Sequence, residues 1–93
     1  MPEITAASRV KLSDDVLFQE LQGDAVLLEL KTGVYFGLDR VGTRIWQLLA
    51  EHETVSDVVA AMIREYDVPE ARCEEDVRVL VARLLDQGLL AIV

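Results

Sequence analysis

Hydrophobic and polar positions divide the chain into two halves with different periods. Residues 16–21, 25–30 and 34–38 are short runs rich in strand-forming residues. Between them, residues 22–24 and 31–33 each contain a glycine and are typical of tight turns. Three short runs with three-residue connections predict an antiparallel sheet whose strands lie in chain order.

The second half has the period of helices. Asp39 is the expected N-cap of a first helix, whose apolar face is flanked by Trp46 and consists of Val41, Ile45, Leu48 and Leu49. Residues 54–57 resemble a capping box with aspartate in place of glutamate, and residues 67–69 end the helix that follows. The apolar positions of this second helix are Val55, Val58, Val59, Met62, Ile63 and Tyr66.

A third helix is predicted from about Arg72 to the residue before Gly88, because glycine is favoured just past a helix end. Its apolar stripe consists of Val77, Leu80, Val81, Leu84 and Leu85. Residues 89–93 are apolar and are expected to form a short last strand or a packed tail.

This order of elements predicts an α+β, winged-helix-like fold, with a three-stranded antiparallel sheet followed by three helices. A three-stranded sheet is marginal alone, so the helices are expected to cover one of its faces. Residues 1–15 are expected to form a flexible N-terminal arm, and residues 16–93 a single domain.

The net charge and the amino-acid composition argue against several classes of function. Seventeen acidic and nine basic residues give a formal net charge of −8, which opposes binding to nucleic acid or to anionic membranes. The single cysteine, Cys73, and the single histidine, His52, leave no disulfide or Cys/His metal set. Residues 74–76 are carboxylates that suit a helix start, so we expect no catalysis, metal or cofactor. No signal peptide or membrane span is evident, and we expect a cytoplasmic location.

The third predicted strand is the candidate binding element. In a meander of three strands the first and third are edges, and Gln19 and Glu20 protect the first of them. Residues 34–38 contain neither charge nor proline. Such an edge is either covered by another part of the chain or used to accept an extended peptide as an added strand.

Side chains around this edge suggest how a peptide would be held. Tyr35 and Phe36 face opposite sides of the strand, and Leu38 shares the side of Phe36 and leads into the first helix. We therefore expect Phe36 to point inward and Tyr35 outward. The flank of the third helix offers candidate groove residues that are more commonly solvated, namely Asp76, Val79 and Arg83.

The motifs from the second turn onward resemble the PqqD-like family. The resemblance begins with Gly-Val-Tyr-Phe-Gly-Leu-Asp at residues 33–39, Gly42, and Ile-Trp-Gln-Leu-Leu at residues 45–49. It continues through Thr54, Val55, Val58, Val59, Tyr66, Asp67, Asp76, Val77, Leu80, Leu84, Gly88, Leu89 and Leu90. It covers about residues 16–92, and the order and spacing of the motifs make it fairly specific.

The resemblance implies a non-catalytic, winged-helix-like protein that recognises the leader segment of a ribosomally synthesised precursor peptide. The leader would add a strand beside the third strand and lie in a groove walled by the third helix. The implied pairing residues are Val34, Tyr35, Phe36, Gly37 and Leu38, and the implied wall residues are Asp76, Val77, Val79, Leu80, Arg83 and Leu84. Residues 16–93 would then be a peptide-recognition domain, with a leader peptidase or another modifying enzyme as a further partner.

Within the family, the Tyr-Phe-Gly-Leu-Asp stretch is most similar to stand-alone proteins of lasso-peptide pathways. The alternative within the family is the chaperone of pyrroloquinoline quinone synthesis, which works with a radical S-adenosylmethionine enzyme. Asp39 stands where many relatives have asparagine, but either residue caps a helix.

Other functional classes stay open on the residues alone. A winged-helix DNA-binding regulator should have a basic recognition helix, whereas residues 67–88 contain six acids and three arginines. A dimerisation module would pair the same edge strand with a second copy, so a homodimer is a possible state. A small enzyme is barely compatible with the residue inventory.

Overall fold

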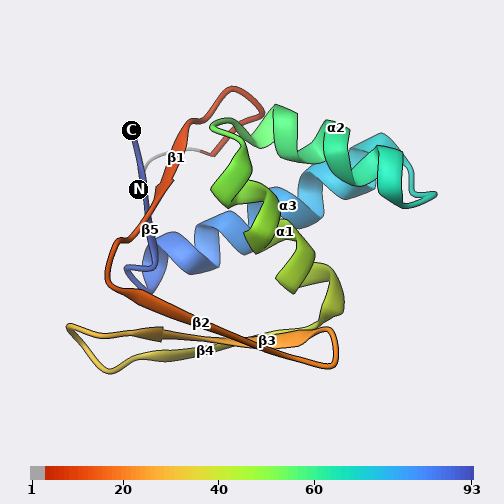
Figure 1. Cartoon of the computed structure of the whole chain (residues 1–93). Coiled ribbons are helices and arrows are strands. Elements are labelled where there is room, and N and C mark those ends of the chain that lie inside the picture. The colour runs from red at the N-terminus through yellow and green to blue at the C-terminus, as the bar shows by residue number, and fades with distance from the viewer. Residues whose placement is uncertain (1–3) are drawn as a thin grey trace.

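The computed structural model describes residues 4–93 and contains five strands and three helices within that range (Figure 1). The elements are β1 (Val10–Leu12), β2 (Val16–Leu21), β3 (Asp24–Glu29), β4 (Tyr35–Leu38), α1 (Arg40–Glu51), α2 (Val55–Glu65), α3 (Glu70–Asp86) and β5 (Leu90–Ile92). The three predicted strands and three predicted helices are confirmed, and the fold is α+β and winged-helix-like.

The main sheet is an antiparallel meander in the order β2-β3-β4. Leu27 of β3 lies opposite Phe18 of β2 and opposite Phe36 of β4. The turns need left-handed backbone, with φ of 57° at Gln22 and 91° at Gly23 in the first and 76° at Gly33 in the second. The glycines at these turns are what made both hairpins visible in the sequence.

The core lies between one face of the main sheet and the helices, which all lie on the same side of it (Figure 1). Side chains alternate along β4, where Phe36 and Leu38 are buried while Tyr35 and Gly37 are exposed. The largest side chains with almost no exposed surface are Leu27, Leu84, Leu89, Val55, Val58, Val77 and Val81. Burial of this apolar set is the main source of stability.

Local hydrogen bonds define where α1 begins and where α3 begins and ends. The Asp39 Oδ1 atom accepts a hydrogen bond of 2.7 Å from the Gly42 amide, which confirms Asp39 as the N-cap of α1. The helix α3 begins at Glu70, two residues before the predicted start, because the Pro69 carbonyl accepts the first helical bond from Cys73. It ends at Asp86, and Gly88 follows with φ of 75°, while the Leu89 amide donates to the Leu84 carbonyl.

The segment expected to be a flexible arm contributes ordered structure from residue 4 onward, while residues 1–3 lie outside the described part of the chain. β1 pairs antiparallel with β5, and the two strands run side by side in Figure 1. The Val10 amide donates to the Glu53 carbonyl, and the Val55 amide donates to the Ser8 carbonyl. Three-residue strands that pair across almost the whole chain leave no local pattern, which is why the sequence pointed to a loose arm.

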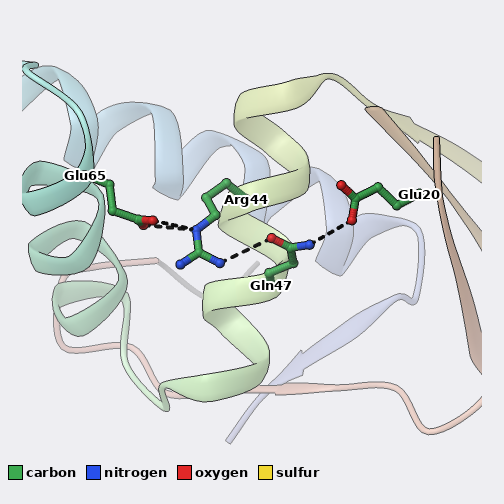
Figure 2. Close-up of polar contacts among 4 residues, drawn as sticks. All are labelled: Glu20, Arg44, Gln47 and Glu65. Carbon is green, nitrogen blue, oxygen red and sulfur yellow. Dashed lines mark hydrogen bonds and ion pairs between the residues drawn. The ribbon is translucent and has the colours of Figure 1, made fainter. Parts of the chain in front are cut away.

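A chain of polar contacts links the two helices α1 and α2 to the edge strand β2 (Figure 2). The Arg44 Nε atom lies 3.0 Å from both Glu65 carboxylate oxygens, and Arg44 Nη1 donates to Gln47 Oε1 at 3.3 Å. Gln47 then donates to Glu20 Oε1 at 3.1 Å. Exposed contacts of this kind contribute little free energy each, so they orient α1 against its neighbours more than they stabilise it.

Replacing Asp39 with alanine is expected to lower the free energy of unfolding by about 1 kcal/mol, because the Gly42 amide loses its only capping acceptor. Asp39→Asn should change stability far less, since asparagine caps equally well. Urea unfolding followed by the fluorescence of the single tryptophan, Trp46, measures both. Equal losses for the two variants would contradict the capping role.

Candidate peptide-binding site

The outer edge of β4 has no partner strand within residues 4–93. The Glu29 amide donates to the Val34 carbonyl at 2.9 Å, so these two residues form a hydrogen-bonded pair. Hydrogen-bonded and non-hydrogen-bonded pairs alternate along an antiparallel ladder. With the β3–β4 register, Phe36 and Leu38 therefore bond toward β3, and the N–H and C=O groups of Tyr35 and Gly37 point to the open edge.

The two aromatic residues of β4 divide as the sequence predicted. Phe36 is 9% exposed and faces the helices, whereas Tyr35 is 71% exposed on the opposite face of the sheet. A strand added beside β4 would place alternate side chains next to Tyr35 and on the helical side. Val34 precedes the strand, is partly exposed, and has its carbonyl turned toward β3.

A groove of about 890 Å³ runs along α3, opposite the junction of β4 and α1. The α3 wall carries four of the predicted residues, spaced so that they share one helix face: Asp76, Val79, Leu80 and Arg83. Val79 is 53% exposed, so it is the apolar side chain most available to a guest on this wall. The other side of the groove is formed by Asp39, Val41, Gly42 and Ile45.

Arg83 connects the wall to the strand. Its guanidinium carbon lies 5.1 Å from the centre of the Phe36 ring, which is within cation–π range. This contact holds the C-terminal half of α3 against the helical side of β4. Arg83 thus both lines the groove and contacts the inward face of β4.

Charges in the groove are mixed. The acids Glu75 and Asp76 lie with Arg72 in the N-terminal half of α3, and Arg83 lies about two turns beyond Asp76. Asp39 lines the other side of the groove. A guest could therefore meet carboxylates at one end and a guanidinium at the other. The mixed charges do not favour a ligand of uniform charge, whereas a groove that binds nucleic acid is lined mainly by basic residues.

Two of the predicted wall residues belong to the core. Val77 and Leu84 are each 0% exposed, because they lie on the face of α3 that packs on the rest of the protein. Neither residue lines the groove itself, although Val77 lines a small cavity beside it. Leu80, at 9% exposed, lies at the boundary between core and groove.

Several groove residues were missed by sequence reasoning, which placed no site on α1 or on the part of α3 before Asp76. They are Val41, Gly42, Ile45, Ala71, Arg72 and Glu75. Val41 was predicted to be a core position of α1, yet it is 45% exposed. Val41 belongs to the same apolar stripe of α1 as the buried residues Ile45, Leu48 and Leu49, but the other elements of the described chain leave its position partly uncovered. The sequence pattern does not show which end of the stripe is left exposed.

The one cysteine, Cys73, is buried in α3. Burial, with smaller contributions from the nearby Asp76 and Glu70 charges, raises the pKa of the Cys73 thiol and so disfavours the nucleophilic thiolate. Between residues 4 and 93 no three His, Cys, Asp or Glu side chains form a cluster that could hold a metal ion. Over the same range, no helix is both long enough and apolar enough to cross a membrane.

Comparison with known proteins identifies the family of this fold and groove. Residues 24–90 match the family described as coenzyme PQQ synthesis protein D (PqqD). No curated protein matches the sequence. Two solved structures are similar. One is TbiB1 in complex with the TbiA(beta) leader peptide, at 42% identity and a TM-score of 0.79, covering 86% of this chain and 93% of that one. The other is lasso peptide synthetase B1 complexed with the leader peptide, at 25% identity and a TM-score of 0.78, covering 89% of this chain and 98% of that one.

The family match spans well over half of the chain, and the architecture agrees with both solved relatives over most of their length. The chain belongs to the PqqD family.

Proposed function

We propose that this protein binds the leader segment of a ribosomally synthesised precursor peptide and presents the precursor to a separate enzyme. The observation that carries the proposal is the open backbone edge of β4 beside the α3 groove. An edge without charge or proline accepts an extended peptide through main-chain hydrogen bonds. The two solved relatives, each bound to a leader peptide, support the same function for this chain.

In this proposal the leader forms a fourth strand that pairs with the outward N–H and C=O groups of Tyr35 and Gly37. The segment Val34 to Leu38 supplies the pairing edge. Alternate leader side chains lie against the α3 wall, formed by Asp76, Val79, Leu80 and Arg83. Affinity comes from the strand hydrogen bonds and from a few apolar leader side chains, while Val77 and Leu84 support the wall from the core.

The role we assign to the protein is tethering without chemistry of its own. Holding the leader raises the effective concentration of the rest of the precursor at an enzyme that binds the same complex. One relative is a lasso peptide synthetase B1 complexed with the leader peptide. We propose a leader peptidase as the enzyme that acts on the complex, and the cytoplasm as its location. A chaperone for a radical S-adenosylmethionine enzyme is the alternative that the family match supports.

The direct test is binding of a fluorescein-labelled leader, followed by fluorescence polarisation. Two probes are used: the TbiA(beta) leader, and the leader of a short precursor reading frame sought among the neighbouring genes. We expect saturable binding of at least one, with a Kd in the micromolar range or below, and no competition from random duplex DNA. Failure of both leaders to bind a folded protein would contradict the proposal.

The same edge could pair with a second copy of the chain. Sedimentation velocity with and without leader distinguishes this state from the proposed one. A monomer that gains only the mass of the leader supports peptide binding at β4. A tight dimer that leader does not dissociate would mean that the edge serves self-association.

A further inference from the structure

Gly37, in the edge strand β4, is the one glycine that the fold itself does not require. Three of the five glycines have positive φ, and a Cβ atom at a fourth, Gly42, would lie 3.2 Å from the Asp39 Oδ1 atom. The φ of Gly37 is not positive. A Cβ atom built at Gly37 would have no heavy atom of residues 4–93 within 4 Å, its two neighbours in the chain aside. The fold therefore has room for a side chain at this position.

A glycine inside a strand needs another explanation in that case. Gly37 is the third of the four residues of β4, and glycine weakens a strand because it has no side chain to pack and loses the most conformational freedom on folding. Such a glycine often marks a place that a ligand or another backbone approaches closely. The N–H and C=O groups of Gly37 point to the open edge, where the leader is proposed to pair.

The space above Gly37 lies on the outer face of the main sheet, which is turned away from the helices (Figure 1). Val26 of β3 lies opposite Gly37 and is 44% exposed. Tyr35, two residues earlier on the same face of β4, is exposed. The missing side chain of Gly37 thus leaves a gap between Val26 and the open edge, with the Tyr35 ring beside it.

A leader strand would place one side chain at this gap. Directly opposite residues of paired strands point their side chains to the same face, so the leader residue opposite Gly37 points to the outer face. Its neighbours there are Val26, across the glycine, and Tyr35, on the diagonal. Aromatic side chains pair favourably with β-branched and with aromatic ones across strands, and a ring laid over an edge glycine covers its bare backbone.

We infer that Gly37 makes this protein specific for an aromatic leader side chain, which lies across the glycine on the outer face of the sheet. The inference rests on the proposed function, because the aromatic residue belongs to the leader strand that pairs with β4. It is not one of the leader residues that enter the α3 groove, since they point to the opposite face of the sheet. A side chain at position 37 fills the gap and excludes the ring.

The variant Gly37→Val separates this role from a structural one, because its effects on stability and on binding have opposite signs. Valine favours strands and has space here, so it should raise the urea midpoint of the free protein by about 0.3–0.5 M. It should weaken binding of the labelled leader that wild type binds by about tenfold, as measured by fluorescence polarisation.

The matched control is Gln19→Val, which places the same side chain on the outer face of β2, on the other side of Val26 and away from the open edge of β4. It should leave the Kd within about twofold of wild type. If Gly37→Val does not fold, Gly37→Ala tests the same position with the smallest side chain, and about a threefold loss of affinity is expected.

The leader supplies the second half of the test. Each aromatic residue of the leader is replaced by alanine in turn, and binding is measured with wild type and with the Gly37 variant. One aromatic position should cost wild type about tenfold and cost Gly37→Val almost nothing, as expected when both changes remove the same contact.

The possible failures can be told apart. If wild type binds leader and the folded Gly37 variants bind equally well, the inference is wrong and strand addition stands. If Gly37→Val weakens binding but no aromatic leader residue couples to it, the glycine admits the leader backbone, and the assigned aromatic specificity is wrong. If wild type binds neither leader, the proposed function fails and this inference fails with it.

Discussion

Replacing Tyr35 with proline should weaken leader binding by about thirty- to a hundredfold while leaving the protein folded. The Tyr35 N–H points to the open edge, so its removal breaks no bond to β3 and leaves a carbonyl of the bound leader without a donor. A lost hydrogen bond with an unpaired, buried partner costs about 2.0–2.8 kcal/mol, which corresponds to that change in Kd. Fluorescence polarisation with labelled leader measures it, and circular dichroism verifies the fold.

Two further variants separate the backbone effect from other causes. Glu20→Pro places a proline at an outward-facing position of β2, the other edge of the same sheet, and should leave binding unchanged. Tyr35→Ala removes the exposed ring and keeps the N–H, so it should cost much less than proline. A folded Tyr35→Pro protein with wild-type affinity would rule out strand addition at this edge.

Truncating Leu84 to alanine should lower the free energy of unfolding by about 3 kcal/mol. Leu84 is fully buried at the centre of the α3 stripe, and buried leucine-to-alanine changes cost about 2–5 kcal/mol. A domain of this size has about 5–14 kcal/mol of stability in total, so the variant should stay folded at room temperature. The urea midpoint should fall without a change in slope, as reported by Trp46 fluorescence.

Val79→Ala is the matched change on the exposed side of the same helix. It should alter stability by no more than about 0.5 kcal/mol and weaken leader binding about fivefold. Folded Leu84→Ala, in contrast, should bind leader nearly as well as wild type. If binding were lost in Leu84→Ala and unaffected in Val79→Ala, Leu84 and not Val79 would be the residue that contacts the leader.

The elements that the sequence predicted are those with local signals. Each hairpin combines a short apolar run with a glycine turn, and Asp39 caps α1 through a bond to a residue three positions away. The orientation of Tyr35 and Phe36 followed from strand alternation and the position of Leu38. What required the structure was the pairing of β1 with β5, since no local rule connects Val10 to Ile92.

Only part of the binding surface was predicted, because exposure on α3 and α1 depends on contacts between elements far apart in the sequence. The spacing of α3 predicted its apolar stripe, but it could not fix how the helix is rotated against β4. The resemblance to the family therefore grouped Val77 and Leu84 with Val79 and Arg83, although the structure buries the first two. The part of the groove on α1 was missed because exposure of Val41 depends on where neighbouring elements end.

The β1–β5 pairing also has a topological consequence. Val10 lies opposite Ile92, so the first and last strands of the described chain lie side by side. A short linker could close the backbone there into a ring, and new ends could be opened at the exposed turn around Gln22 and Gly23. A circular permutant of this kind would keep the β3–β4 hairpin, the groove and α3 as one uninterrupted stretch of chain.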